Sequence, residues 1–202
     1  MLEYALLTFG SLFAIVDPFA AIPAFLAMTP QDSVPERKKT ARTASLVCWV
    51  VLTAFAASGP LIFKMLGITL KAFQIAGGLV LLLSSLDMLR AQPSPLRETA
   101  EETAAGLSKD DVAITPLAIP MLSGPGSITT VIVLAGHADG WPKLAIFYGV
   151  VALVSLLSYL TLTLAASGAK RLSPIALNII NRLMGLMLVA IGVQFIISAL
   201  KI

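Results

Sequence analysis

The chain has 202 residues, of which 57% are hydrophobic and 12% charged, with a formal net charge of +3 and a mean hydropathy of +0.92. A soluble domain carries about 25% charged residues, so this composition predicts a single membrane domain over residues 1–202. Nucleic-acid binding would require a clustered basic face, which the scattered basic residues do not form. The sequence also contains no metal-binding cluster, phosphate loop or redox motif, so we expect no metal or cofactor.

Six apolar segments are each long enough to cross a bilayer, which takes about 20 helical residues. In chain order they are residues 4–29, 43–63, 71–89, 112–136, 144–169 and 176–200. The expected fold is therefore an all-α polytopic membrane protein with six transmembrane helices.

The first segment contains Asp17 and Pro18 near its middle. A carboxylate is costly to bury in a bilayer, and proline removes a backbone donor, so we expect this helix to be broken near the membrane midplane. Asp followed by Pro is also a typical helix start, with Asp as the N-cap. Two roles for Asp17 remain open. It caps the free amides of residues 19–21, or it lines a cavity and holds a substrate ammonium, a coupling cation or a proton.

The fourth segment contains a second break, the Gly-Pro-Gly sequence at 124–126. Because glycine has no capping side chain, the amides of residues 126–128 are expected to stay open at the positive end of the following half-helix. Open amides at a helix N-terminus form an anion site. The hydroxyls of Ser123 and Ser127 could add donors to it.

The second half of the sequence repeats features of the first at a constant offset of 107 residues. Pro18 falls on Pro125, and Gly78 falls on Gly185. This register predicts two repeats of three spans each, residues 1–95 and 108–202, joined by a cytoplasmic linker at 96–107.

Because each repeat has an odd number of spans, the second must enter the membrane from the opposite side. The two units are then inverted repeats related by an axis in the membrane plane. Irregular backbone within a membrane must be buried in protein or face a water-filled cavity. The broken helices 1 and 4 are therefore expected at the centre, with the two breaks close together.

Basic residues predict the orientation. The side that follows the first, third and fifth spans holds ten of the 14 basic residues, namely Arg37, Lys38, Lys39, Arg42, Arg90, Arg97, Lys109, Lys170, Arg171 and Arg182. The opposite side holds the other four, Lys64, Lys71, Lys143 and Lys201. The positive-inside rule places the first side in the cytoplasm and both termini outside.

A carboxylate at one break and an anion site at the other would complement a zwitterion, and small lining residues would leave room for a small solute. The predicted substrate-binding residues are Asp17, Pro18, Phe19, Ala20, Ala21, Ser123, Gly124, Gly126 and Ser127. Asp17 is also the candidate for coupling transport to protons. The expected function is a secondary transporter working by alternating access, coupled to protons or acting as an exchanger.

Two other functional classes must be considered, a channel and an intramembrane enzyme. A channel could be built if one Asp17 per chain formed a ring, so a homo-oligomer remains an open alternative. An intramembrane aspartyl protease would need two carboxylates sharing a site, and Asp87 lies near a membrane edge. A serine protease would need a base, and His137 also lies at an edge. We therefore expect no enzymatic activity.

Three stretches carry a family resemblance: 16–23 (VDPFAAIP), 116–127 (PLAIPMLSGPGS) and 182–186 (RLMGL). They resemble the signature stretches of the MarC/SnatA family, in the same order and over the whole chain. The resemblance implies a multi-pass inner-membrane protein of a bacterium or archaeon that transports small neutral amino acids such as glycine and alanine. The chain departs from the family pattern at Ala21, where the family often has an asparagine that could contact a substrate.

Overall fold

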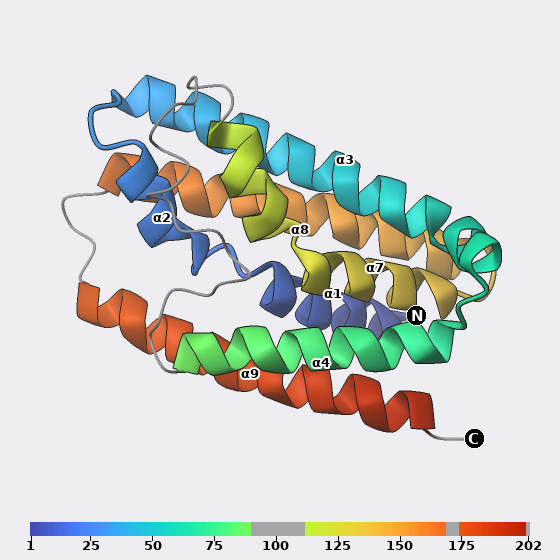
Figure 1. The fold of residues 1–202 in the computed structure, drawn as a ribbon. Coiled ribbons are helices and arrows are strands. Elements are labelled where there is room, and N and C mark those ends of the chain that lie inside the picture. Colours follow the sequence, from blue (N-terminus) through green and yellow to red (C-terminus); the bar gives the residue numbers. More distant parts are fainter. Residues whose placement is uncertain (90–111, 169–173, 201–202) are drawn as a thin grey trace.

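The computed structural model describes residues 1–89, 112–168 and 174–200, and every regular element in these ranges is a helix (Figure 1). The predicted linker at 96–107 lies outside the described residues. The described helices fall into two groups on either side of this gap.

The first group consists of α1 (Leu2–Val16), α2 (Ala21–Met28), α3 (Val34–Leu66) and α4 (Leu70–Leu89). The second consists of η1 (Ala113–Leu122), α7 (Pro125–Gly136), α8 (Trp141–Gly168) and α9 (Pro174–Leu200). The first and fourth predicted spans are each divided, as expected. The axes of α1 and α2 differ by 42°, and those of η1 and α7 by 58°.

Three helical segments in the described residues are long and apolar enough to cross a membrane, and five spans result if each bent pair counts as one. The remaining predicted span corresponds to α4, which has 20 residues. Within the described residues, Leu70–Leu83 of this helix forms a shorter apolar helix. The sixth span therefore stays a prediction.

The helices form three layers. Figure 1 shows α3 and α8 running antiparallel on one side, α4 and α9 running antiparallel on the other, and α1 and α7 between them, while η1 packs against α3. Helix α7 packs against both α3 and α4, while α1 packs against α8 and α9. The breaks themselves are buried, as at Val16, Asp17 and Ser123, and buried positions are where interrupted backbone is tolerated within a membrane.

Local sequence signals explain the irregular and terminal segments. Within η1, Thr115 and Ile119 leave the helical region, with φ near −127° at both. Each directly precedes a proline, and the residue before a proline favours extended backbone. The peptide bonds before both prolines are cis. Helix α3 begins after Ser33, whose amide donates to Glu36 at 2.8 Å, and ends at Gly67 with φ 65°.

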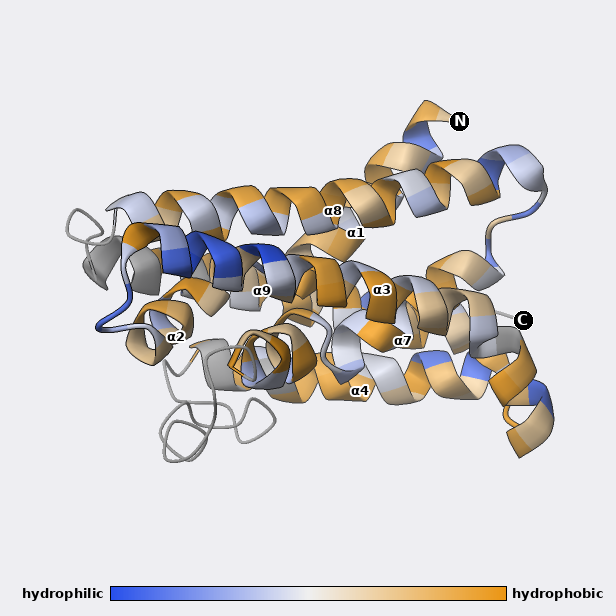
Figure 2. Cartoon of the chain, turned by 90° about the horizontal axis from the view of Figure 1, so that it is seen from above, coloured by the Kyte–Doolittle hydropathy of each residue, from blue (hydrophilic) through white to orange (hydrophobic). Residues whose placement is uncertain are grey.

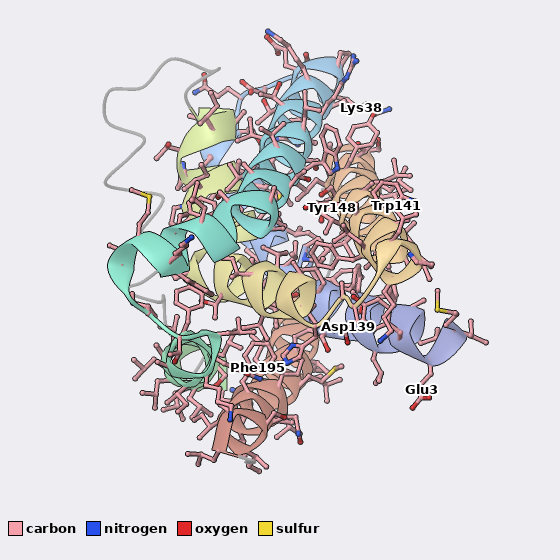
Figure 3. All side chains as sticks on the ribbon, turned by 90° about the vertical axis from the view of Figure 1, so that its right-hand side faces the viewer. Glu3, Lys38, Asp139, Trp141, Tyr148 and Phe195 are labelled. Atoms are coloured by element: carbon pink, nitrogen blue, oxygen red, sulfur yellow. The ribbon has the colours of Figure 1, made fainter. Side chains whose placement is uncertain are left out.

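The outer surface is apolar. On the four outer helices, side chains such as Leu46, Leu79, Leu164 and Leu186 are more than half exposed, as expected for helices that face lipid. Figure 2 shows that the most hydrophilic part of α3 is its N-terminal end. Figure 3 looks onto the opposite end of the bundle, which carries Glu3, Asp139 and Trp141.

Candidate functional site

The first break is built around Asp17. Its backbone adopts the left-handed conformation (φ 43°, ψ 69°), while its amide still donates to the Phe13 carbonyl at 3.0 Å. This geometry closes α1 at Val16. Asp is one of the few residues that tolerate the left-handed region. The side chain is 1% exposed, and its Oδ1 accepts a hydrogen bond from the Ala20 amide at 3.2 Å.

The prediction that Asp17 and Pro18 start the second half-helix is therefore wrong in one respect. Asp17 ends the preceding helix, and residues 18–20 form a turn before α2 begins at Ala21. The carboxylate nevertheless satisfies an amide in the predicted range 19–21. Of the other predicted residues here, Pro18 and Ala21 are buried. The Phe19 ring packs edge-on against Phe13, with 6.0 Å between ring centroids.

The second break agrees with the sequence in its helix start. Gly124 is extended (φ −74°, ψ 178°), and Pro125 is the first residue of α7. The Ile128 amide donates to the Gly124 carbonyl at 2.9 Å, so the expectation that this amide stays open is wrong. The amides of Gly126 and Ser127 lie in the first turn, where backbone N–H groups have no intrahelical acceptor.

The two serines of this break bond to the backbone. The Ser123 hydroxyl donates to the Ala118 carbonyl at 2.7 Å, and the Ser127 hydroxyl donates to the Leu122 carbonyl at 3.0 Å. Both side chains are almost fully buried. The Ala118 carbonyl also accepts from the Ser123 amide at 2.9 Å, so the two hydroxyls add hydrogen bonds to backbone carbonyls beside the bend. In this conformation the serines therefore stabilise the bend and do not donate to an anion.

The two breaks lie close together. Helix α1 packs against α7, and α2 packs against η1. A Cβ built on Gly126 would lie 3.6 Å from Cγ2 of Ile15, two residues before Asp17. The predicted proximity of the breaks is thus seen directly between the end of α1 and the start of α7.

A cavity of about 30 Å³ lies beside the second break. Its lining includes Ile15 of α1, Leu81 of α4, Gly124 and Gly126 at the break, and Leu188 of α9. This volume matches one water molecule in the liquid, so the cavity is too small for an amino acid in this conformation. Asp17 is not among the lining residues.

Gln74, near the start of α4, is a buried polar residue whose side chain is only 5% exposed. Within residues 1–89, 112–168 and 174–200, no group of three or more His, Cys, Asp or Glu side chains could hold a metal ion.

Comparison with known proteins gives one consistent result. The model of a family described as MarC family integral membrane protein matches residues 2–202. A UPF0056 membrane protein of Methanocaldococcus jannaschii is 40% identical, with 99% of this chain and 97% of the relative covered. The UPF0056 membrane protein YvbG of Bacillus subtilis is 34% identical, with coverages of 100% and 96%.

A third relative, the UPF0056 membrane protein YhcE of Escherichia coli, is 30% identical over 96% of this chain and 90% of its own length. These relatives come from both bacteria and archaea and are described as membrane proteins. No solved structure matches the chain.

Proposed function

Because the chain belongs to the MarC family of integral membrane proteins, we propose that it is a secondary transporter of small neutral amino acids such as glycine and alanine. It works by alternating access in the inner membrane of its cell, as a proton-coupled carrier or an exchanger, and catalyses no reaction. The observation that carries this proposal is the pair of broken helices. They meet inside the bundle, and one of the breaks holds a buried carboxylate.

Element positions support an inverted repeat. Helix α3 begins at Val34 and α8 begins at Trp141, which is the predicted offset of 107 residues. These two corresponding helices pack against each other in antiparallel directions, and so do α4 and α9 (Figure 1). Antiparallel pairing of corresponding helices is the arrangement that a two-fold axis in the membrane plane produces.

Individual contacts between α4 and α9 also support an inverted repeat. A Cβ on Gly78 would lie 2.6 Å from the Gly192 carbonyl oxygen, so these two backbones are in contact. Under the 107-residue offset, this pair maps onto Ser85 and Gly185. Both of those residues are buried.

The chemistry at the breaks suits a zwitterion. Asp17 supplies a negative charge for a substrate ammonium or a proton. The first-turn amides of Gly126 and Ser127, at the positive end of α7, suit a carboxylate. The remaining predicted substrate-binding residues flank these groups: Pro18, Phe19, Ala20, Ala21, Ser123 and Gly124.

The cavity of about 30 Å³ is too small for an amino acid in the described conformation. Admitting an amino acid requires the helices around the cavity to separate, and Leu81 of α4 is the side chain nearest to Gly126. Movement of α4 and α9 relative to α7 would enlarge the cavity. Such relative movement of the two repeats is what alternating access requires.

Transport assays with purified protein in proteoliposomes test this function. We expect saturable uptake of labelled glycine or alanine, accelerated by unlabelled substrate inside the vesicles and altered by a pH gradient. Uptake that rises linearly with concentration and ignores internal substrate would indicate a channel and contradict the carrier mechanism.

The variant Asp17→Asn tests the coupling role. Its amide oxygen can still accept from Ala20, and asparagine tolerates left-handed backbone, so the protein should fold. We expect proton-coupled transport to be lost or uncoupled. Asp139→Asn is the control, because it removes a carboxylate from the surface at the end of the bundle. The Asp139 side chain is 91% exposed, and its Oδ2 lies 3.9 Å from Nζ of Lys143. Full proton-coupled transport by Asp17→Asn would exclude this carboxylate from coupling.

A further inference from the structure

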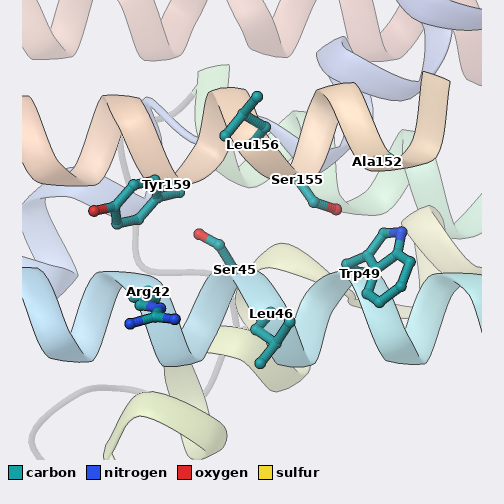
Figure 4. Close-up of a pocket in the computed structure, with 8 residues that line it drawn as sticks. All are labelled: Arg42, Ser45, Leu46, Trp49, Ala152, Ser155, Leu156 and Tyr159. Atoms are coloured by element: carbon teal, nitrogen blue, oxygen red, sulfur yellow. The ribbon is translucent and has the colours of Figure 1, made fainter. Parts of the chain in front are cut away.

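A groove of about 480 Å³ lies between α3 and α8, on the side of these helices away from the broken helices (Figure 4). We call it the α3/α8 groove and define it by Arg42, Ser45 and Trp49 of α3 and Ser155, Leu156 and Tyr159 of α8. Figure 4 shows Arg42 and Tyr159 at one end, Trp49 at the other, and the two serines between them. The groove lies outside the proposed transport site.

The two serines at the middle of the groove carry unsatisfied hydroxyls. Ser45 is 4% exposed and Ser155 is 5% exposed, and neither Oγ has a hydrogen-bond partner within the described residues. The Ser155 hydroxyl lies near the Cys48 thiol without making a hydrogen bond of good geometry. By contrast, Ser158 one turn away donates to the Val154 carbonyl at 2.9 Å.

Serine in a membrane helix normally makes the bond that Ser158 makes, and a buried hydroxyl without a partner is unfavourable. In Figure 4 the hydroxyls of Ser45 and Ser155 point into the space between the helices. Their position indicates a ligand that supplies hydrogen-bond acceptors at this depth.

The ends of the groove indicate the rest of that ligand. Lys38 and Arg42 lie four residues apart, on one face of α3 near its N-terminus, and favour an anionic group. Leu156, which is 52% exposed, and Trp49, which is 38% exposed, form apolar walls that face the lipid side. Arg42 and Trp49 are seven residues apart, which corresponds to about 10 Å along a helix.

We propose that the α3/α8 groove binds an anionic phospholipid of the surrounding bilayer. The phosphate lies at Arg42, the ester carbonyls accept hydrogen bonds from Ser45 and Ser155, and an acyl chain continues along Trp49. The lipid comes from the leaflet on the Lys38 side, which the charge distribution predicts to be cytoplasmic. A second copy of the chain is a poorer occupant, because a symmetric interface places the same patch on both subunits and would therefore have to bury two Arg42 side chains.

Tryptophan fluorescence can report on the groove directly, because the chain has only two tryptophans, Trp49 and Trp141. Trp141 is 78% exposed at the far end of the bundle, so Trp141→Phe leaves Trp49 as the single probe. The full chain is reconstituted in phosphatidylcholine vesicles with a minor fraction of phosphatidylglycerol. Two preparations are compared: in one the phosphatidylglycerol carries brominated acyl chains, and in the other the phosphatidylcholine carries them. Brominated chains quench the fluorescence of an adjacent tryptophan.

Brominated phosphatidylglycerol is expected to quench Trp49 with about fivefold preference over its share of the bilayer, the effect of about one basic side chain at a membrane surface. Arg42→Gln should lower this preference to near one, and Arg42→Lys should retain most of it. Lys64→Gln, at the other end of α3, should leave it unchanged. The proposal would be overturned by any of three results: equal quenching by both lipids, a preference that survives Arg42→Gln, or no quenching of Trp49 by either lipid.

A second measurement tests the serines. A ligand that binds the folded state raises its unfolding temperature, so adding phosphatidylglycerol to the protein in detergent should raise Tm. Each variant is compared with itself, with and without lipid, which separates binding from any change in basal stability. The rise should be largely lost in Ser45→Ala/Ser155→Ala and in Arg42→Gln but kept in Lys64→Gln. An equal rise in all of these proteins would contradict the site.

Discussion

At the residue scale, Asp17 has structural roles that do not depend on its proposed function in transport. The carboxylate caps the Ala20 amide, and the left-handed backbone ends α1. Both features would be needed even if no solute were bound. The capping role that the sequence left open is therefore present in the structure. The carboxylate binds the amide of Ala20, the N-cap residue of α2, while the Asp17 backbone closes α1. Contact with a substrate or proton remains part of the proposed function.

Gly124 and Gly126 at the second break should differ in their tolerance of a methyl group. A Cβ on Gly124 would lie 2.5 Å from the Pro120 carbonyl oxygen, which is backbone and cannot move away easily. A Cβ on Gly126 would lie 2.7 Å from Cδ2 of Leu81, the end of a flexible side chain. Gly124→Ala should therefore destabilise the protein by about 1–3 kcal/mol. Gly126→Ala should cost less than about 1 kcal/mol, the order of a rotamer adjustment.

Thermal unfolding of both variants in the same detergent measures this difference. Gly149→Ala on α8 is a suitable control, because no atom lies within 4 Å of a Cβ built there. If Gly124→Ala unfolds at the same temperature as Gly126→Ala, the close contact of residue 124 with the Pro120 carbonyl does not exclude a methyl group.

At the element scale, the sequence predicted the breaks well but not how each is completed. Proline and glycine act through their own backbone, so the interruptions near 17–18 and 124–126 could be located from local chemistry. Whether Asp17 closes one helix or opens the next depends on its φ angle, which two adjacent residues do not determine. The acceptors of Ser123 and Ser127 depend on which carbonyls the bend exposes, and this is a property of the folded chain.

The α3/α8 groove was missed for a different reason. Its two walls, near residues 42–49 and 152–159, are far apart in sequence, and each alone looks like an ordinary apolar helix face. Only the packing of α3 against α8 reveals that Ser45 and Ser155 face each other across a space. The helical spacing of Lys38, Arg42, Ser45 and Trp49 was the available signal in the sequence.

The connection between α2 and α3 should depend on Arg37. Its Nε and Nη2 atoms donate to the Thr29 carbonyl at 3.0 and 2.7 Å, and Nη2 also lies 3.3 Å from the Pro30 carbonyl. These carbonyls follow the C-terminal end of α2, where a cation is favourable. Arg37→Gln should lower the free energy of unfolding by about 1.5–3 kcal/mol, the usual range for hydrogen bonds to a charged group.

Arg37→Lys should have an intermediate effect, because lysine keeps the charge but loses the planar fork. Lys38→Gln is the neighbouring control on the exposed face of α3. If Arg37→Gln and Lys38→Gln unfold at the same temperature, the Arg37 contacts contribute little to stability.

At the scale of the whole molecule, the charge distribution predicts an orientation that labelling can test. Gln31, before α3, and Asp139, before α8, are exposed near opposite ends of the bundle. In a Cys48→Ala background, a membrane-impermeant maleimide should label Asp139→Cys in intact cells. It should label Gln31→Cys only after the membrane is permeabilised. The reverse pattern would place both termini in the cytoplasm and contradict the positive-inside count.

The contact between Gly78 and Gly192 has a mechanical consequence for the bundle. Most helix pairs are held in one crossing angle because side-chain ridges sit in the grooves of the partner. Where two glycine backbones touch directly, the helices approach more closely than a pair of side chains would allow. Ile196 and Leu82 pack around this contact, so α4 and α9 are held together as one closely packed pair. A methyl group at Gly78 would meet the Gly192 carbonyl and force the two helices apart.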